Sequence, residues 1–354
     1  MAPLLRFRIK DVSQRVACKV AGLTLVLFIL QSVSKTNPVH AMLGAGATQS
    51  AIAAEKIKLG LNKPLIIQYF NYLHGIVTGN LGMSYRTRRP VASDLATYLP
   101  ATLELATYAL LLAVFLGTIL GILSAGKFKG AAIIKGVLVS GASIPQFLLA
   151  IAGLLFLYGK LKLLPATGRI GIANPPTGPT GFYTIDGILN GRLGVTLDAF
   201  KYLALPCLSV AIGPAVSIGR VLRGSLLETM NSDFVKTANS KGISRTRVIL
   251  VHALRNSIGP ALSMTGLQAG LMFAGVVVIE DVFAWPGIGY YTAQSIPSGD
   301  FPAIAGVTLV LGVGYVIINA AVDIAQLLAD PRLRRMEMAS SRKRASHPHA
   351  VVNT

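Results

Sequence analysis

Few residues of this sequence have the types and spacings that enzymatic chemistry requires. No GxxxxGK(S/T) phosphate loop, HExxH zinc-binding helix or GxSxG nucleophile motif occurs anywhere in the chain. The two cysteines, Cys18 and Cys207, lie in or beside apolar runs, with no CxxC motif or Cys/His cluster nearby. We therefore expect no catalytic residue and no metal site, and we expect both thiols to be small buried groups.

The polar residues that are candidates for a functional role lie inside apolar runs. Glu104 stands near one end of the run 102–125, and Ser143, Pro145 and Gln146 stand in the middle of the run 136–158. A proline frees a carbonyl group and bends its helix, while polar side chains at membrane depth must face protein or water. These four residues are candidates for lining a polar path. Packing between helices is the alternative for the three central residues, and contact with water at the span's edge is the alternative for Glu104.

A basic polar segment, residues 220–260, separates two apolar runs near the C-terminal end. Its expected helix boundaries follow cap and proline preferences: Asp233 as N-cap and Gly242 as terminator of a first helix, Ser244 as N-cap of a second, and Pro260 at the start of a third. Phe234 and Ala238 are four residues apart and share one face of the first helix. Such a short capped helix suits a groove on a partner protein. The alternative is a basic loop without a partner.

The same segment resembles the EAA loop of ATP-binding-cassette importer permeases, in the variant of the dipeptide/oligopeptide (nickel) permeases. The matching stretches are Lys236-Thr237-Ala238-Asn239-Ser240-Lys241-Gly242-Ile243, His252-Ala253-Leu254-Arg255-Asn256 and Pro260. Gly242 and Pro260 are 18 residues apart, as in that branch. The family usually has arginine and alanine where this chain has Asn239 and Ser240, so any salt bridge of that arginine is absent here.

Further motifs extend the resemblance over residues 16–335. They are Leu59-Gly60-Leu61-Asn62-Lys63-Pro64, Gly79-Asn80-Leu81-Gly82-Met83-Ser84-Tyr85, Phe283-Ala284-Trp285-Pro286-Gly287-Ile288-Gly289 and Asp330-Pro331-Arg332. We expect Gly79 and Gly82 to serve backbone conformation, and the stretch 283–289 to form a turn and an aromatic anchor at the membrane interface.

The resemblance implies a B-type permease subunit with the type I importer fold, whose loop 222–258 docks on an ATPase. The residues expected to make that contact are Asp233, Phe234, Val235, Lys236, Thr237, Ala238, Asn239, Ser240, Lys241, Gly242 and Arg245. It implies four partners: a homologous second permease, two ATPase subunits that bind ATP and Mg, and an extracytoplasmic substrate-binding protein. This chain itself would hold no cofactor and would not be an enzyme.

Composition independently places the chain in a membrane. Of 354 residues, 53% are hydrophobic and 13% charged, and the mean hydropathy is +0.61. The net charge of +19 is spread between apolar runs without any nucleic-acid-binding module, so we expect no nucleic-acid partner. The chain is therefore predicted to be an all-α integral membrane protein with six transmembrane helices.

The expected organisation follows the apolar runs. It consists of a cytoplasmic N-terminus (1–15), a first span (16–34), a large extracytoplasmic loop (35–98) with short helices at 51–58 and 66–76, a core (99–328) and a basic cytoplasmic tail (329–354). The five core spans are expected at 102–125, 136–158, 202–218, 261–282 and 302–328, with an irregular outer loop at 160–201. A cleaved signal peptide, with Ala45-Gly46-Ala47 as its cleavage site, is the alternative for the first span.

The distribution of positive charge orients these spans. The segments expected inside hold 20 Lys and Arg in 87 residues, against 12 in 125 for the segments expected outside, and the short outer loop 283–301 holds 0. Both termini are thus predicted in the cytoplasm. The family resemblance implies that the chain crosses the plasma membrane of a bacterial cell several times.

Three rival functions remain open from the sequence. A secondary transporter would need a titratable relay and inverted repeats, but apart from Glu280 and Asp281 at the end of one span, only Glu104 and Asp323 lie within spans, and no repeat is seen. An intramembrane enzyme would need a catalytic pair at depth. Within the family, nickel or another small solute could replace di- and oligopeptides as the imported substrate.

Overall fold

The structure, a computed structural model, describes residues 21–32, 46–58, 60–126, 130–141, 144–175 and 178–329. Within these ranges the regular structure is helical, and one isolated β-bridge joins Met83 to Pro90. The expected all-α class is therefore confirmed. The predicted N-terminus (1–15), the path candidate Ser143 and the tail from residue 330 lie outside the described residues.

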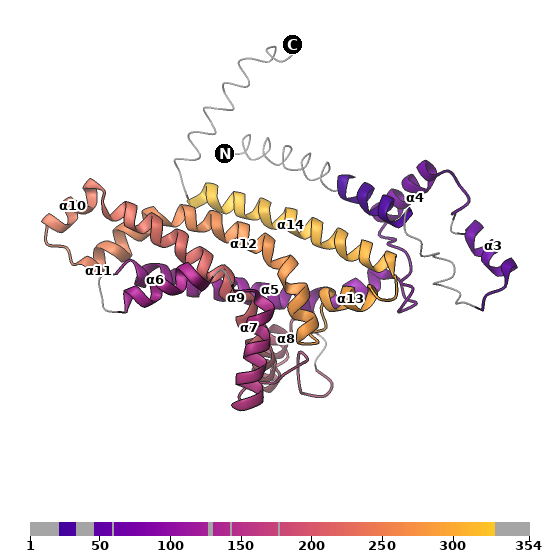
Figure 1. The fold of residues 1–354 in the computed structure, drawn as a ribbon, viewed down its shortest axis with the longest axis horizontal. Coiled ribbons are helices and arrows are strands. Elements are labelled where there is room, and N and C mark those ends of the chain that lie inside the picture. Colours follow the sequence, from indigo (N-terminus) through magenta and orange to yellow (C-terminus); the bar gives the residue numbers. More distant parts are fainter. Residues whose placement is uncertain are drawn as a thin grey trace, which may run out of the picture. The chain divides into compact units, whose positions relative to one another are not determined.

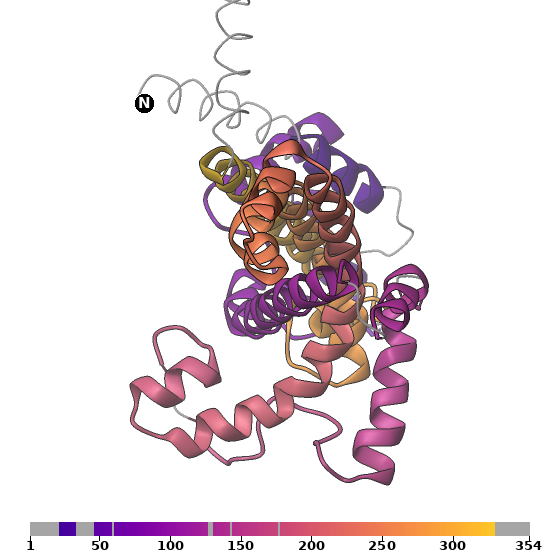
Figure 2. The same cartoon turned by 90° about the vertical axis from the view of Figure 1, so that its left-hand side faces the viewer.

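Helices follow one another along the whole described chain (Figure 1). After the helix Ala21–Ser32 they are α3 (Gln49–Lys58), α4 (Leu65–Val77), α5 (Val91–Ser124), α6 (Ala131–Ser140), α7 (Gln146–Gly153), the π-helical η2 (Leu154–Lys160), α8 (Tyr183–Leu189), α9 (Leu193–Met230), α10 (Asp233–Ser240), α11 (Arg245–Arg247), the π-helical η3 (Val248–Ala253), α12 (Leu254–Val282), α13 (Ile288–Ser295) and α14 (Phe301–Ala329). Figure 2 shows α7 and η2 as one continuous helical rod.

Three of these helices are long and apolar enough to cross a membrane: Val91–Ser124, Leu193–Met230 and Phe301–Ala321. The helical stretch from Arg245 to Val282 makes a fourth if its two parts form one span. Two shorter apolar helices, Ala21–Ser32 and Gln146–Lys160, lie where the first and third spans were expected. The count of six spans stays a prediction.

Several predicted helix boundaries are wrong, and prolines explain most of the differences. The span expected at 102–125 belongs to a helix, α5, that starts at Val91 and contains Pro100, and Pro260, expected to begin a helix, lies inside α12. The helix α9 begins at Leu193, nine residues before the expected start, and continues through Pro206. A proline removes one backbone hydrogen bond, and packing of the surrounding helix can offset that loss where neighbours satisfy the freed carbonyl. Apolar runs located the membrane core of each helix but missed its polar extensions.

The prediction for Pro145 is also wrong. We expected Pro145 to bend a helix from within, but it directly precedes the first residue of one. It is extended (φ −60°, ψ 138°) and directly precedes α7, while α6 already ends at Ser140. Proline suits this position because the first turn of a helix has no use for its missing N–H group.

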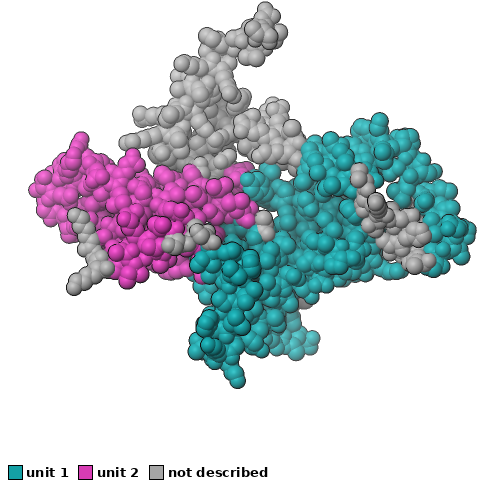
Figure 3. All heavy atoms as spheres, in the orientation of Figure 1, with its two compact units in different colours: residues 1–112, 144–211, 272–316 teal, residues 113–143, 212–271, 317–354 magenta. Residues whose placement is uncertain are grey.

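The chain forms two compact units, each assembled from three stretches of sequence (Figure 3). Unit 1 comprises residues 1–112, 144–211 and 272–316, and unit 2 comprises residues 113–143, 212–271 and 317–354. Four long helices, α5, α9, α12 and α14, contribute residues to both units.

The core of unit 1 joins the first part of α5 to α13 and α14. Its buried residues are Val91, Leu95, Ile288, Tyr291, Ala303 and Val307. Tyr291 also stacks on Tyr98, with ring centroids 5.1 Å apart. Aromatic pairs of this kind add about 0.5–1.5 kcal/mol to the burial term.

Unit 2 depends on close backbone contact between α5 and α9. A Cβ atom at Gly117 would lie 2.8 Å from the Ala215 carbonyl oxygen, and one at Gly219 would lie 2.9 Å from the Gly117 carbonyl oxygen. Small residues allow this approach, which membrane helices use because lipid provides no hydrophobic drive for their association. The Gly117-xxx-Gly121 pattern of the sequence thus has a packing role.

Candidate functional site

The short helix α10 (Asp233–Ser240) is the centre of the candidate site, and it lies in unit 2. Its end is fixed by a pair of hydrogen bonds: the Ile243 N–H donates to the Ala238 carbonyl (3.3 Å) and the Gly242 N–H to the Asn239 carbonyl (2.9 Å). This is the Schellman arrangement, in which the residue after the cap is left-handed. Gly242 has φ +75°, as the sequence predicted for the helix terminator.

The other end of α10 differs from the prediction by one residue. Ser232 is the N-cap, with extended geometry (φ −72°, ψ 156°), and Asp233 is the first helical residue. Neither side chain accepts a capping hydrogen bond; Asp233 instead pairs with Lys236 at 2.8 Å, and both groups are exposed. An exposed pair of this kind contributes at most about 1 kcal/mol. Ser244, by contrast, precedes α11 as predicted.

The apolar face of α10 is also not the one expected from the sequence. Ala238 is buried, together with the fully buried Val235 and Val248, while Phe234 is 46% exposed. Val235 and Ala238 therefore hold α10 against the following turn, and Phe234 stands apart from that contact. The i, i+3 spacing of Val235 and Ala238 was the available signal, but the buried partner Val248 lies too far along the chain to be paired by pattern alone.

The remaining predicted residues of α10 and its flank form an exposed surface. These are Lys236, Thr237, Asn239, Ser240, Lys241, Gly242 and Arg245. One half-exposed aromatic ring therefore lies among hydroxyl, amide and cationic groups. Figure 1 shows α10 and α11 in a turn at one end of unit 2. The arrangement suits a partner that offers an apolar pocket edged by acidic groups.

Two buried contacts join the long helices α9 and α12 next to this turn. Leu222 and Leu226 of α9 pack with Ala253 and Ala261, which flank the start of α12. The hydroxyl of Ser257 in α12 lies within hydrogen-bond distance of the Thr229 hydroxyl (2.8 Å) and of the Ser225 carbonyl (3.2 Å) in α9. Val248, which packs on α10, and Ala253, which packs on α9, both belong to η3, so buried contacts run from α10 to α9 within unit 2.

Glu104, the first of the path candidates, is buried in unit 1 and fully used by hydrogen bonds. Arg169 donates to its Oε2 from Nε (2.8 Å) and Nη2 (2.5 Å), and Thr184 donates to its Oε1 from the backbone (3.0 Å) and the hydroxyl (2.6 Å). The guanidinium also lies over the ring of Tyr183, 4.2 Å from its centroid. Sequence reasoning identified the acid but missed its partners, which lie in a loop expected to be irregular.

The other two path candidates that the structure describes, Pro145 and Gln146, are not part of a comparable hydrogen-bond network. Pro145 is exposed, and Gln146 is half-buried against Gly275 of α12, where a Cβ would lie 2.4 Å from the amide oxygen. In the described part of the chain no hydrogen bond joins Gln146 or Pro145 to Glu104. Pro145 and Gln146 are thus not part of the hydrogen-bond network of Glu104.

The stretch 283–289 forms the expected turn, but its tryptophan is not an interfacial anchor. Trp285 is 1% exposed, and its Nε1–H donates to the Ala101 carbonyl at 2.9 Å. The Glu280 carboxylate accepts hydrogen bonds from Thr102 (2.6 Å) and from the backbone of Gly289 (2.6 Å) at the start of α13. The buried indole found a hydrogen-bond partner within the protein, as such groups usually do.

A third polar network, which the sequence did not reveal, joins the segment 84–94 to α13 and α14. Asp300 accepts a hydrogen bond from the Ser84 hydroxyl, and Asp94 accepts from Thr87 (2.5 Å) and from Tyr291 (3.1 Å). Burial and the nearby aspartates raise the pKa of Tyr291 above its ordinary value. The only signal in the sequence was the motif at 79–85, which contains Ser84.

Comparison with known families decides the class of the protein. Residues 113–335 match the family described as "Binding-protein-dependent transport system inner membrane component", and residues 4–106 match the description "Binding-prot-dependent transport system membrane comp, N-term". The chain belongs to the family of binding-protein-dependent transport system inner membrane components. The resemblance inferred from the sequence motifs is confirmed.

Individual relatives of the permease are similar along most of its length. It is 37% identical to the probable D,D-dipeptide transport system permease protein of Escherichia coli (strain K12) over 320 residues, covering 89% of the permease and 94% of the relative. It is 36% identical to a dipeptide transport system permease protein of Alkalihalophilus pseudofirmus over 315 residues, covering 88% and 95%. A di/tripeptide transport system permease protein of Pseudomonas aeruginosa is 37% identical over 317 residues, with 88% and 94% covered.

Proposed function

We propose that this permease is one membrane subunit of an ATP-driven importer and forms part of the path for di- and oligopeptides. The relatives named above are dipeptide and di/tripeptide permeases, and similarity over nine-tenths of the chain supports the same substrate class here. The chain has no phosphate loop, so the free energy of ATP hydrolysis must come from separate ATPase subunits.

The observation that carries the coupling proposal is the construction of α10. Buried Val235 and Ala238 fix the helix on unit 2, and its end is set by Gly242, while Phe234 remains 46% exposed. A rigid short helix with one exposed aromatic ring is a preorganised ligand for a groove. The proposed contact set is Asp233, Phe234, Lys236, Thr237, Asn239, Ser240, Lys241, Gly242 and Arg245, with Val235 and Ala238 as its internal support.

The proposed assembly contains a second homologous permease, two ATPase subunits and an extracytoplasmic substrate-binding protein. It lies in the bacterial plasma membrane with six spans in this chain, a large outer first loop and both termini in the cytoplasm. Closure of the ATPase pair on ATP would move α10, and the buried contacts of α9 and α12 would pass that movement to the spans. Hydrolysis would then reset them, giving alternating access.

The direct test is uptake by proteoliposomes that contain the complete transporter. With the binding protein and a radiolabelled dipeptide outside and ATP inside, we expect ATP-dependent accumulation that a non-hydrolysable ATP analogue abolishes. Nickel is the alternative solute within the family, so nickel-63 uptake is measured in parallel. Accumulation of nickel without dipeptide would replace the substrate proposal, and ATP-independent uptake of either would contradict the importer mechanism.

A further inference from the structure

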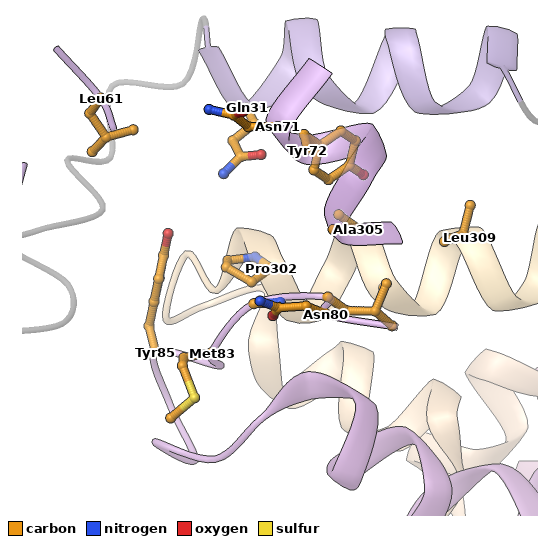
Figure 4. Close-up of a pocket in the computed structure, with 14 residues that line it drawn as sticks. Gln31, Leu61, Asn71, Tyr72, Asn80, Met83, Tyr85, Pro302, Ala305 and Leu309 are labelled. Carbon is orange, nitrogen blue, oxygen red and sulfur yellow. The ribbon is translucent and has the colours of Figure 1, made fainter. Parts of the chain in front are cut away.

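A cavity of about 370 Å³ opens within unit 1 (Figure 4), and two of its lining residues, Met83 and Tyr85, flank Ser84 of the Asp300 network. It is bounded by the helix Ala21–Ser32, by α4, by the segment 80–85 and by the beginning of α14. In Figure 4, Gln31, Asn71 and Tyr72 lie on one side of the cavity and Asn80 and Pro302 on the opposite side. Its volume falls in the range of small-ligand sites, roughly 300–1,000 Å³.

The polar side chains that line this cavity within the described ranges are all uncharged. They are the side-chain amides of Gln31, Asn71 and Asn80 and the phenols of Tyr72 and Tyr85. Leu81, Ala305 and Leu309 provide an apolar floor. In the part of the chain that the structure describes, the side chains of Gln31 and Asn71 make no hydrogen bond to the protein, so their donors and acceptors are available to a ligand.

The absence of charge among the described lining residues discriminates between ligand classes. Phosphate groups are bound by Arg, Lys or backbone nests, and divalent cations by carboxylates or imidazoles, and none of those side chains lines the cavity. Burial and the nearby Asp300 raise the pKa of Tyr85 to about 12, so its phenol stays neutral at physiological pH. A neutral ligand that both donates and accepts hydrogen bonds fits this lining.

We propose that the cavity binds an uncharged stretch of peptide backbone. A side-chain amide carries one acceptor and two donors in a plane, which matches the N–H and C=O groups of a peptide unit whatever its side chains are. The apolar floor accepts a small side chain. Given the proposed function, such backbone has two sources: the transported peptide, or a loop of the substrate-binding protein docked on the outer face.

The test compares Gln31→Leu/Asn71→Leu with His74→Leu in the assembled transporter in lipid nanodiscs. Leucine keeps the bulk of the amide side chains and removes their hydrogen bonds, and His74 is an exposed polar residue of α4 outside the cavity lining. The first probe is N-acetyl-alanyl-alanine amide, which has neutral ends, added without binding protein. Two lost hydrogen bonds weaken its affinity about 5- to 150-fold, and His74→Leu leaves the affinity unchanged.

The second probe is the purified binding protein, whose affinity for the same transporters is measured separately. Loss of dipeptide-amide binding in the double variant assigns the site to the transported peptide, and loss confined to binding-protein affinity assigns it to the docked loop. Equal affinities in all three transporters for both probes, or a co-purified phospholipid that occupies the cavity in mass spectra of each, would overturn the proposal. ATP-dependent dipeptide uptake by the wild-type complex shows separately whether the proposed function itself holds.

Discussion

At the scale of single residues, Gly242 controls the geometry of the proposed docking helix. Its φ of +75° is a conformation that L side chains with branched Cβ atoms avoid, at a cost of about 1–2 kcal/mol or more. A Cβ atom at this position would meet no other atom within 4 Å, so backbone strain alone is the expected cause of any defect.

Gly242→Val is therefore expected to displace the end of α10 and to reduce peptide-stimulated ATP hydrolysis of the reconstituted transporter severalfold. Gly242→Asn is the matched control, because asparagine tolerates the left-handed conformation. Equal loss of stimulation in both variants would point to a need for open space at Gly242 rather than for its conformation.

The ion pair between Glu104 and Arg169 is expected to stabilise the fold rather than to contact a partner. Both side chains are buried, at 1% and 7% exposure, and Oε2 lies 2.5 Å from Nη2. Removal of one partner leaves an uncompensated buried charge, which typically costs about 3–5 kcal/mol.

We expect Arg169→Met to lower the thermal stability of the purified complex strongly, and Glu104→Gln/Arg169→Met to recover a large part of the loss. Heat treatment followed by size-exclusion chromatography measures the surviving complex. If the double variant is as unstable as the single one, the charge pair does not explain the effect. Full stability of both variants with altered peptide uptake would instead support the path role that the sequence left open for Glu104.

At the scale of elements, helix contacts depend on where small residues allow the backbones to approach. Gly117 of α5 leaves no room for a Cβ atom beside Ala215, whereas a Cβ atom at Gly213 of α9 would meet no atom within 4 Å. Two glycine-to-alanine substitutions in unit 2 therefore have opposite expected outcomes.

Gly117→Ala should separate α5 from α9 and reduce the yield of folded permease in the membrane, as assessed by detergent extraction and resistance to protease. Gly213→Ala should keep normal yield and gain slightly in helix stability, by up to about 1 kcal/mol. The packing interpretation fails if the two variants behave alike.

Sequence patterns predicted elements well where local chemistry decides them. The short helices near 51–58 and 66–76 appear as α3 and α4, and Gly79 and Gly82 have the positive φ values that their motif suggested. Patterns failed where tertiary contacts decide. Pro100 lies inside α5, and Trp285 is buried against Ala101 instead of facing the membrane interface. Neither outcome can be obtained without knowing the neighbouring helix.

The candidate site shows the same division. Gly242 and the presence of α10 followed from cap preferences, whereas the buried role of Ala238 required knowledge of Val248. Arg169 and Thr184 could not be assigned to Glu104, because they lie 65 and 80 residues away in sequence. Patterns thus identified which residues matter more reliably than what those residues contact.

At the scale of the whole molecule, the family assignment and the apolar helices leave the orientation in the membrane as a prediction. Ser298 follows α13 in the segment expected outside, and Ser240 ends α10 in the segment expected inside; both side chains are exposed. Each can therefore report its side once the native Cys18 and Cys207 are replaced by alanine.

The measurement uses cells whose outer membrane is permeabilised and whose plasma membrane is sealed. A maleimide that cannot cross the plasma membrane should label Ser298→Cys and leave Ser240→Cys unlabelled. Disruption of the membrane and removal of the ATPase subunits, which would otherwise cover Ser240, should make both react. Labelling of Ser240→Cys from outside would contradict the predicted orientation. It would mean that α10 lies on the side of the membrane opposite to the ATPase subunits.

The central claim is that α10 is the contact through which ATPase subunits drive this permease, and Phe234 tests it most directly. Burial of a phenylalanine side chain is worth roughly 1.5–3 kcal/mol, which corresponds to about a 10- to 150-fold change in affinity. Phe70 of α4 is a matched control, since it is a phenylalanine with 64% exposure outside the proposed contact.

The measurement is peptide-stimulated ATPase activity of the reconstituted transporter, together with the amount of ATPase subunit retained by the tagged permease. Phe234→Ala should lose most of the stimulation and retain less ATPase subunit, while Phe70→Ala should match the wild type in both. Undiminished stimulation and retention in Phe234→Ala would contradict the coupling role of α10.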